Sequence, residues 1–386
     1  MDQQLYPMHT EPVYRHYIWG GIALHDLLGK PLGPEGTLAE SWEIADDARA
    51  ANGPLQGKTL RAIDEETQAA LTGDAPRYAN ARLALLIKLS HAAQDLSVQV
   101  HPNDEQALRD EPDKGYPGKS EMYLILQAEP GAGIYWGLRD GVTPEQLAQA
   151  CRSGRGVPEL LNFVPVAAGD VLYSPSGVVH AIGKGIVYCE VQQNSDITYR
   201  LYDWGRLGTD GKPRPLHLEQ ALRVIDPRPR ARPRIRPLPL PMPAGTMAET
   251  RYMQTATGID SYQVEAPIRG QRTMLCASPH FAVELLELEG PAQLARARRA
   301  LRAAVMLEGQ VTIRGDGPEA AVVSTGQSVA LPASMDSIIA EPAATTRLVL
   351  VYLPAMQADV IIPLRAAGYS DEEIAQLGDV PVSTSA

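Results

Sequence analysis

The sequence holds few cysteines, few aromatic residues and no long apolar runs. Only three of its 386 residues are cysteine, 5% are aromatic and two are phenylalanine. Cys151, Cys189 and Cys276 form no CxxC pair, and their odd number argues against a disulfide framework. No stretch approaches 18 apolar residues, and residues 1–15 contain no apolar signal segment. We therefore expect a soluble, cytoplasmic protein in a reducing setting, without a membrane partner.

Positive charge is also in short supply. The 46 acidic residues outnumber the 35 basic ones, which gives a formal net charge of −11. Proteins that bind duplex nucleic acid normally carry a dominant basic surface, so this balance argues against nucleic acid as the partner. It does not exclude a small anionic ligand, because a single buried arginine or lysine can hold a phosphate group.

Glycine, proline and apolar residues are plentiful. The chain contains 33 glycines and 32 prolines, and 44% of its residues are hydrophobic. Its length allows two or three domains, each with a substantial core. Many turn-forming residues with few aromatics favour a loop-rich, mainly β protein over a helical bundle.

Short apolar segments separated by glycine and proline predict strands. Two helices are expected, around Asp64–Leu71 and at Pro144–Cys151. The expected strands of the first half are Leu83–Leu89, Leu96–His101, Met122–Gln127, Phe163–Val166, Asp170–Tyr173, Val178–Ile182 and Ile186–Val191. Those of the second half are Phe281–Leu288, Ala304–Leu307, Gln310–Arg314, Gln327–Leu331 and Arg347–Leu353. Their spacing indicates antiparallel sandwiches or barrels with a few helices.

A weak internal repeat suggests two related domains. Residues 169–182 align with residues 326–339 through a glycine, a proline and a final isoleucine. His180 falls opposite Ser337, so a site built on that histidine is not reproduced in the second copy. Between the copies, Asp226–Gly245 is rich in proline and arginine and reads as a solvated connector or an edge crossing. The expected domains are 1–225 with the site, 226–245 as the connector, and 246–386.

Four polar residues of the first domain form a possible metal-ligand set. In the strand Leu96–His101 the side chains of Ser97, Gln99 and His101 share one face. With Glu121 and His180, two imidazoles, a carboxylate and an amide oxygen could bind Zn²⁺ or another divalent first-row ion. The alternative is that these histidines are structural. Glutamine is an uncommon ligand, which makes Gln99 the weakest member on chemistry alone.

The segment Glu190–Arg206 is unusually polar for one with apolar flanks. Its glutamine, asparagine, serine and aspartate residues at 192–196 need hydrogen-bond partners if they line a cavity. The alternative is a polar hairpin on the surface.

At these positions the chain resembles type I mannose-6-phosphate isomerase, a zinc enzyme of the cupin superfamily, in its short form. The matching pieces follow the family order over residues 14–206, about half of the chain. They are Trp19–Gly21, Glu40–Glu43, Leu96–Asp104, Gly118–Met122, Pro175–Gly183 and Glu190–Arg206. The resemblance implies two cupin-like antiparallel β-barrels or jelly rolls, the second of them degenerate.

The resemblance also implies roles for individual residues. One zinc ion per chain would be bound by Gln99, His101, Glu121 and His180. The catalytic group would comprise Arg200, Glu190 and Lys119, with Glu190 as the first candidate for the base. The substrate, a sugar phosphate, would contact Ser97, Arg206 and Asp196. Some relatives have lysine where this chain has Arg206, and either cation can pair with phosphate.

The activity implied is interconversion of mannose 6-phosphate and fructose 6-phosphate through an enediol. Such a site must hold an open-chain sugar, supply a base and stabilise oxyanion character. The metal-bound water or a histidine could replace Glu190 as the base. The alternatives are another metal cupin, such as a glucose-6-phosphate isomerase or an iron oxygenase, and a sugar-phosphate-binding regulator without turnover. The chain could be a monomer or a dimer.

Overall fold

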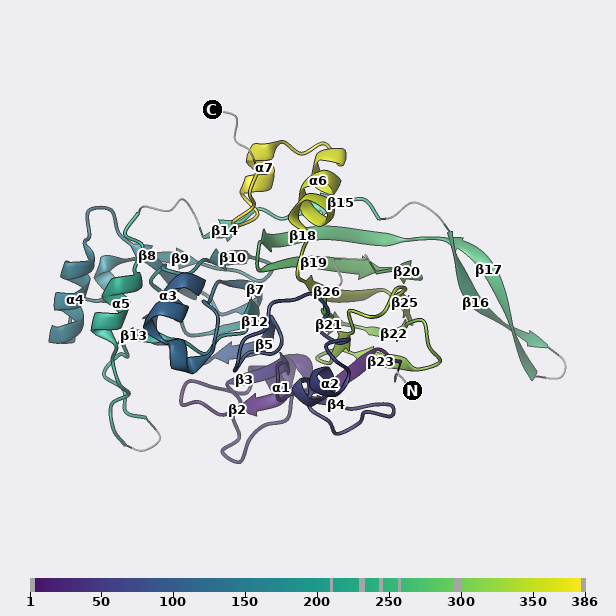
Figure 1. Ribbon diagram of the computed structural model, residues 1–386, viewed down its shortest axis with the longest axis horizontal. Helices are drawn as coiled ribbons and strands as arrows, with labels where there is room; N and C mark the ends of the chain where they lie inside the picture. Colours follow the sequence, from purple (N-terminus) through teal and green to yellow (C-terminus); the bar gives the residue numbers. More distant parts are fainter. Residues whose placement is uncertain are drawn as a thin grey trace. The chain divides into compact units, whose positions relative to one another are not determined.

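The computed structural model describes residues 4–208, 211–228, 233–242, 246–255, 258–294 and 300–382. Contacts divide the chain into two compact units. The first, called the site unit here, comprises residues 12–48 and 76–236. The second unit comprises residues 1–11, 49–75 and 237–386. Both units consist mainly of antiparallel strands (Figure 1), which confirms the predicted fold class.

The site unit contains a seven-stranded antiparallel sheet. Its order is β14-β10-β7-β12-β5-β3-β2. The strands are β14 (Arg234–Ile235), β10 (Val171–Ser174), β7 (Glu121–Ala128), β12 (Ile186–Gln193), β5 (Leu85–Ala92), β3 (Glu40–Ile44) and β2 (Val13–Arg15). Every residue of β5 and β12 is buried, which explains their nearly continuous apolar sequences and makes the few polar residues within them conspicuous.

A five-stranded sheet forms the second layer of this unit. Its order is β13-β6-β11-β8-β9. The strands are β13 (Tyr199–Tyr202), β6 (Val98–Val100), β11 (His180–Ile182), β8 (Gly133–Leu138) and β9 (Leu161–Pro165). Along the chain its strands alternate with those of the seven-stranded sheet, so neighbouring segments of sequence contribute to both layers. Among the described strands, neither sheet of this unit closes on itself into a barrel.

Two apolar clusters fix the layers of the site unit. Tyr123 and Ile125 of β7 pack with Ile134 of β8 and Ile182 of β11, which joins the two sheets. The opposite face of the five-stranded sheet carries apolar side chains that pack against two helices, α4 (Pro144–Ser153) and α5 (Leu218–Val224). The other helical segments are α1 (Ala23–Leu28), α3 (Asp104–Asp110) and the 3₁₀ turns η1 (Pro112–Lys114) and η2 (Pro158–Leu160).

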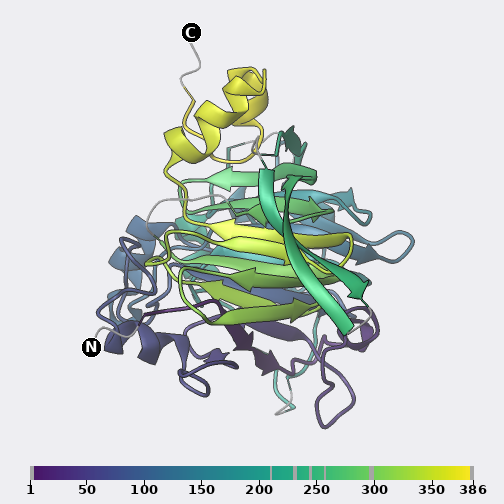
Figure 2. The same cartoon turned by 90° about the vertical axis from the view of Figure 1, so that its right-hand side faces the viewer.

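The second unit contains an eight-stranded and a four-stranded antiparallel sheet (Figure 2). The larger sheet consists, in order, of β15 (Leu238–Leu240), β18 (Gly270–Ser278), β19 (Phe281–Leu288), β26 (Thr346–Tyr352), β21 (Arg302–Glu308), β24 (Ser328–Leu331), β1 (Met8–Glu11) and β4 (Arg49–Ala50). The smaller consists of β20 (Ala292–Gln293), β25 (Ile339–Pro342), β22 (Gln310–Arg314) and β23 (Ala320–Ser324). A separate hairpin pairs β16 (Thr246–Thr255) with β17 (Gly258–Pro267).

The helices of the second unit lie in its N-terminal and C-terminal segments. They are α2 (Leu60–Glu66), the π-helical turn η3 (Met356–Ile361), α6 (Ile362–Ala366) and α7 (Asp371–Ala375). A helix was expected around Asp64–Leu71, and this prediction is wrong at its C-terminal end. Gln68 and Ala69 have φ values of 50° and 70°, in the left-handed region, so the chain leaves the helix after Glu66. At its start the Thr59 side chain accepts a hydrogen bond from the Ala62 N–H.

The internal repeat is visible in the structure. β10 and β24 each begin two residues after the aligned glycine and have the same length. The strand that follows β10 is β11, which ends at the aligned Ile182. The strand that follows β24 is β25, which begins at the aligned Ile339. The predicted repeat therefore marks equivalent strands of the two units.

The contact units differ from the expected domains at the N-terminus. β1 pairs with β24, and β4 pairs with β1, so these early strands join the sheet of the second unit. A three- or four-residue strand has no sequence pattern that identifies a partner 300 residues away. Arg234–Ile235 and Leu238–Leu240 each pair with the edge of a sheet, as expected of an edge crossing. That residues 226–245 connect two folding domains stays a prediction.

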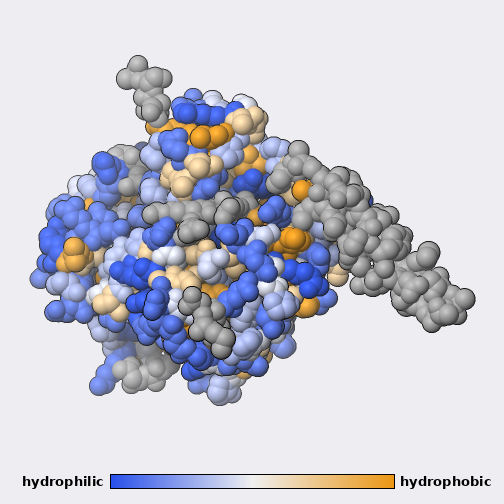
Figure 3. All heavy atoms as spheres, turned by 45° about the vertical axis from the view of Figure 1, so that its right-hand side comes forward, coloured by the Kyte–Doolittle hydropathy of each residue, from blue (hydrophilic) through white to orange (hydrophobic). Residues whose placement is uncertain are grey.

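Three further features can be compared with the composition: the hydropathy of the surface, the length of the apolar helices and the state of the cysteines. Figure 3 shows a face on which hydrophobic residues are interspersed among hydrophilic ones. In the described part of the chain, no helix has the length and apolar character needed to cross a membrane. The three cysteines are buried and unbonded.

Gly183, which follows β11, provides a test of the packing between β8 and β11. A Cβ at this position would lie 2.2 Å from the carbonyl oxygen of Gly133, so the backbone would have to move. We expect Gly183→Ala to lower the free energy of unfolding by about 1–3 kcal/mol, as for overpacked cores. Equilibrium urea unfolding measures this change. Gly290→Ala is the matched control, since its nearest neighbours are side-chain atoms 3.7 Å away. Equal midpoints for the two variants would contradict the assignment.

Candidate active site

Three neighbouring strands of the five-stranded sheet align the polar residues of the site. On β6, Val98 and Val100 belong to the cluster beneath α4 and α5, so the alternate residues Gln99 and His101 face the seven-stranded sheet. Gln99 lies directly opposite His180 of β11 on one side and Arg200 of β13 on the other. Side chains paired in this way across strands project to the same face.

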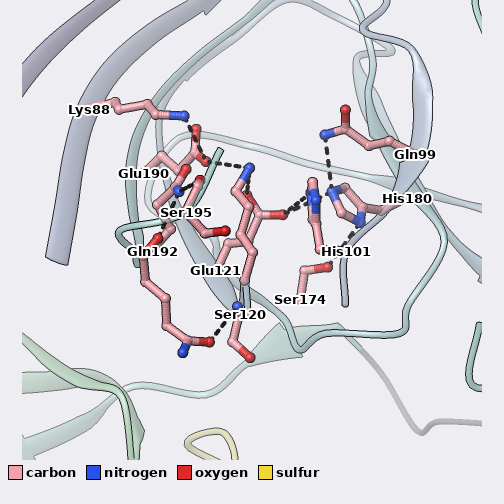
Figure 4. A network of polar contacts seen from close by, with 12 residues as sticks. Lys88, Gln99, His101, Ser120, Glu121, Ser174, His180, Glu190, Gln192 and Ser195 are labelled. Atoms are coloured by element: carbon pink, nitrogen blue, oxygen red, sulfur yellow. Dashed lines mark hydrogen bonds and ion pairs between the residues drawn. The ribbon is translucent and has the colours of Figure 1, made fainter. Parts of the chain in front are cut away.

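The facing sheet contributes a carboxylate to the same point. Oε1 of Glu121, the first residue of β7, lies 3.0 Å from Nε2 of His101 and 3.0 Å from Nε2 of His180. All three residues are buried, and their donor atoms lie within 4.8 Å of one another. This group is labelled in Figure 4.

Both imidazole rings are oriented by backbone carbonyls. Nδ1 of His101 lies 2.8 Å from the carbonyl oxygen of Ile197, and Nδ1 of His180 lies 3.0 Å from that of Val178. A carbonyl only accepts hydrogen bonds, so each Nδ1 carries the proton and each Nε2 presents a lone pair to the centre. Metal-binding histidines in proteins are held in this way by their second nitrogen.

The arrangement needs a cation. Within the described residues, Nε2 of His101 and Oε1 of Glu121 are buried and have no hydrogen-bond partner. Burial, with the nearby Lys119 ammonium, lowers the pKa of His101 to about 4, so this ring is neutral and its lone pair faces the carboxylate across 3.0 Å. Burial alone would raise the pKa of Glu121, but the Lys119 ammonium holds it well below its usual range. A divalent ion would satisfy all three acceptors at once.

Gln99 can complete the set. Its amide nitrogen lies 3.4 Å from Nε2 of His180. Rotating the amide by half a turn exchanges its nitrogen and oxygen, because the two ends of the group have the same shape. The oxygen then faces the same centre as the two imidazoles and the carboxylate. The structure therefore brings together all four residues of the expected ligand set.

A hydrogen-bonded turn places Glu121. Asp104 Oδ1 accepts hydrogen bonds from the Gly118 N–H and from the Gln193 side chain, both at 2.8 Å. The Gln193 amide oxygen in turn accepts from the Ser120 N–H at 2.9 Å. A Cβ on Gly118 would lie 2.4 Å from the backbone of Asn103, so only glycine fits this approach. The residue before Glu121 is thereby tied to the start of α3 and to the end of β12.

From Glu121 a row of alternating charges runs across the seven-stranded sheet (Figure 4). Lys119 Nζ lies 3.1 Å from Glu121 Oε2 and 3.9 Å from Glu190 Oε1. Lys88 Nζ lies 3.5 Å from the same Glu190 oxygen and 3.9 Å from Glu40 Oε1. All five side chains are buried. Three carboxyl groups thus share two ammonium groups in this buried row.

The pKa values of Glu190 and Lys88 in this row are both raised, but for different reasons. Burial, together with repulsion from Glu121, raises the pKa of Glu190 to about 8, although Lys88 and Lys119 oppose the shift. Burial would lower the pKa of Lys88, but Glu190 and Glu40 raise it, so Lys88 is charged.

Arginines gather at the other side of Gln99. Arg200 Nε donates a hydrogen bond of 3.3 Å to the hydroxyl of Ser97, which is buried. Arg206 donates to a carboxylate oxygen of Asp203 at 2.7 Å, and its Nη1 atom is buried without a partner. Burial, with Arg214 and Arg206 close by, lowers the pKa of Arg200. Arg200 thus contacts Ser97, and Arg206 contacts Asp203. That these residues bind or act on the substrate stays a prediction.

Asp196, the remaining expected residue, is exposed. Its charge acts on Tyr17, whose pKa is raised chiefly by burial and also by Glu40. Lys88 acts on the same Tyr17 hydroxyl, so Asp196 belongs to the Lys88 end of the site.

Two members of the site, Lys88 and Glu40, received no role from the sequence. Lys88 is the one charged residue within the apolar stretch Leu83–Leu89, and a lone charge in a buried strand was the signal available. Glu40 lies in a piece that matches the family, but nothing in that piece indicated a contact with Lys88.

Comparisons with known proteins agree on one family. The model for "Phosphomannose isomerase type I, catalytic domain" matches residues 8–128. Mannose-6-phosphate isomerase ManA of Bacillus subtilis (strain 168) is 42% identical over 227 residues, which cover 57% of this chain and 68% of that protein.

Solved structures extend the likeness to most of the chain. The crystal structure of the mannose 6-phosphate isomerase from Bacillus subtilis has a TM-score of 0.71 at 28% identity and covers 90% of this chain and 100% of that one. A structure of mannose 6-phosphate isomerase bound with zinc and yttrium has a TM-score of 0.64 at 19% identity and covers 90% of this chain and 99% of that one. The second comparison supports the fold only.

The metal centre can be tested without an activity assay. We expect His101→Ala and His180→Ala each to lose the bound divalent ion, because each removes one of the converging donors. Elemental analysis of the purified protein, after exposure to Zn²⁺ and removal of free metal, measures the ion content. His16→Ala, which changes an exposed histidine outside the cluster, should keep the wild-type content. One ion per chain in either cluster variant would contradict the assignment.

Proposed function

The chain belongs to the type I phosphomannose isomerase family, and on this premise we propose that it interconverts mannose 6-phosphate and fructose 6-phosphate. The observation that carries the proposal is the convergence of His101, Glu121 and His180 beside a row of buried charges and a group of arginines. These parts correspond to the needs of an aldose–ketose isomerase, which must orient two sugar oxygens, move a proton between adjacent carbons and hold a phosphate.

Zinc is the proposed cofactor, one ion per chain, held by Gln99, His101, Glu121 and His180. Two imidazoles with oxygen donors form a set that Zn²⁺ accepts readily. A mannose 6-phosphate isomerase of similar fold was crystallised with zinc and yttrium. When bound, the ion would polarise the two reacting sugar oxygens as a Lewis acid.

Glu190 is the proposed base. In the direction from aldose to ketose its carboxylate takes the proton from C2, and an enediol forms. The same proton then returns to C1, while the hydroxyl proton of O2 passes to O1, so no atom is gained or lost. Lys119 lies between Glu190 and Glu121 and is placed to relay protons or to orient both carboxylates. General base catalysis of this kind contributes about 10²–10⁴ in rate.

Arg200 is the proposed stabiliser of the negative charge on the enediolate that forms when the C2 proton is removed. Its position opposite Gln99 sets it one strand away from a proposed metal ligand. A positioned cation acts strongly in a buried, water-poor site, and loss of one such donor costs about 10²–10³ in rate. Ser97 and Arg206 are proposed to bind the phosphate group, and Asp196 to contact the sugar near the entrance.

A coupled assay on mannose 6-phosphate, with and without chelator, tests the activity. We expect isomerisation that stops on chelation and returns with Zn²⁺. The same assay distinguishes the alternatives. Turnover of glucose 6-phosphate in place of mannose 6-phosphate, or bound iron with oxygen uptake, would point to a different metal cupin and contradict the proposal. Tight binding of mannose 6-phosphate without product would indicate a regulator and contradict it as well.

The role of Glu190 can be separated from that of the metal. We expect Glu190→Gln to lower kcat at least 100-fold, because the amide cannot take the proton, while zinc content stays at the wild-type level. Kinetics and elemental analysis on the same preparation measure both. Glu159→Gln, outside the site, is the control and should have wild-type kcat. Near-normal turnover by Glu190→Gln with zinc bound would remove Glu190 from the mechanism.

A further inference from the structure

One carboxylate holds two of the arginines beside the site. Asp203 accepts two hydrogen bonds from Arg214, from Nε at 2.7 Å and from Nη2 at 2.6 Å. Oδ1 of the same carboxylate accepts a bond of 2.7 Å from Arg206 Nη2. The bidentate contact with Arg214 fixes the plane of the carboxylate, since two parallel N–H···O bonds leave it little freedom to rotate. Arg206 Nε also donates a hydrogen bond of 3.3 Å to the backbone carbonyl of Asp203. Arg214 therefore holds the carboxylate that binds the Nη2 end of Arg206.

The residues that follow Arg214 also hold Arg200. The carbonyl of Pro215 accepts a hydrogen bond of 3.1 Å from Arg200 Nη1. His217 makes two bonds to the backbone of Arg200: its ring Nδ1 accepts from the Arg200 N–H at 3.1 Å, and its N–H donates to the Arg200 carbonyl at 2.8 Å. The segment 214–217 thus contacts Arg200 directly and reaches Arg206 through Asp203.

The charges of this cluster do not balance. Arg200, Arg206 and Arg214 carry three positive charges, and Asp203 is the one carboxylate among their described ion-pair partners. Burial alone would raise the pKa of Asp203, but the bonds from Arg214 and Arg206 lower it, so it is ionised. Within the described part of the chain two positive charges are left over, and a buried N–H group of Arg206 has no partner there. A phosphate monoester in its dianionic form would neutralise both charges and accept that N–H bond.

We propose that Arg214 is a positioning residue of the phosphate subsite, which acts through Asp203 to aim the guanidinium of Arg206 and keeps Arg200 beside Ser97. This inference rests on the proposed function. If Arg214 only formed a surface ion pair, phosphate affinity would depend on the total charge alone. As a positioning residue, Arg214 makes phosphate affinity depend on the geometry of the Asp203 carboxylate as well.

Asp203→Asn separates these two possibilities by the sign of its effect. If charge alone mattered, removal of a negative group would tighten phosphate binding. If Asp203 aims Arg206, the weaker amide contact loosens the arginine and weakens phosphate binding. We expect the dissociation constant for inorganic phosphate, measured by titration calorimetry on the metal-loaded enzyme, to rise about tenfold. Tighter binding in Asp203→Asn would overturn the inference.

Variants of Arg214 complete the test. We expect Arg214→Ala to raise KM for mannose 6-phosphate and the phosphate dissociation constant about tenfold, with kcat reduced less than threefold. Arg214→Lys keeps the charge but cannot form the bidentate contact, so it should show most of the same loss. Wild-type affinity in either variant would overturn the inference. Arg234→Ala, which breaks an exposed ion pair with Asp170, is the matched control and should leave both constants within twofold.

The controls separate this inference from the proposed function. Thermal unfolding and metal content, measured on each variant, identify loss of fold or of the ion. If the wild-type enzyme does not isomerise mannose 6-phosphate, the proposed function fails, and the phosphate titrations still decide the role of Arg214. If the wild-type enzyme isomerises the sugar and the Asp203 and Arg214 variants bind phosphate normally, the inference fails and the proposed function stands.

Discussion

The site depends on lone pairs held against one another in a buried place. Two imidazole nitrogens and a carboxylate oxygen meet at 3.0 Å with no proton between them, because each ring donates its proton to a backbone carbonyl on its other side. Without a cation the contact between these lone pairs is repulsive. Among the described residues, Nε2 of His101 and Oε1 of Glu121 have no hydrogen-bond partner, and Nε2 of His180 has only the amide nitrogen of Gln99 at 3.4 Å. The two packed sheets of the site unit keep the three atoms together. A bound divalent ion would remove the repulsion among them.

The other charges of the site can be understood from the same centre. Buried charges are tolerated when each has an opposite neighbour, and the row from Glu121 through Lys119, Glu190 and Lys88 to Glu40 alternates in sign. On the far side of Gln99 positive charge is in excess, since Arg206 and Arg214 bind the one carboxylate of Asp203 and Arg200 bonds Ser97 and the Pro215 carbonyl. The proposed isomerase would use such a division, with proton transfer at one end and an anion held at the other.

The second unit shows what the same strand pattern becomes without this constraint. The position of His180 is occupied there by Ser337. A buried carboxylate of this unit, Glu284, is satisfied by protein groups alone, since it accepts hydrogen bonds from Arg272 and from the hydroxyl of Tyr352. No acceptor of Glu284 needs a metal ion, in contrast to Glu121. The aligned strands are thus present in both units, but the histidine of the first copy is a serine in the second.

Local patterns in the sequence were sufficient for most strands and for the proposed metal ligands. Alternation along Leu96–His101 put Gln99 and His101 on one face, Glu121 and His180 supplied the other donor types, and the pieces that match the family supplied Arg200 and Glu190. Residues within a strand obey a period of two whatever lies beside them, so this part of the prediction needed no tertiary information.

Only the tertiary structure decided which strands are neighbours and which side chains share a charge. Three contacts illustrate this. β1 pairs with β24, Lys88 contacts both Glu190 and Glu40, and Asp203 binds two arginines. Each contact joins residues that lie on different strands or loops. The amino-acid sequence by itself determined the β-rich class, the two related copies and the donor atoms. The contacts among those atoms depend on long-range packing, because the energy of a buried charge or an unpaired acceptor is set by whatever the fold places beside it.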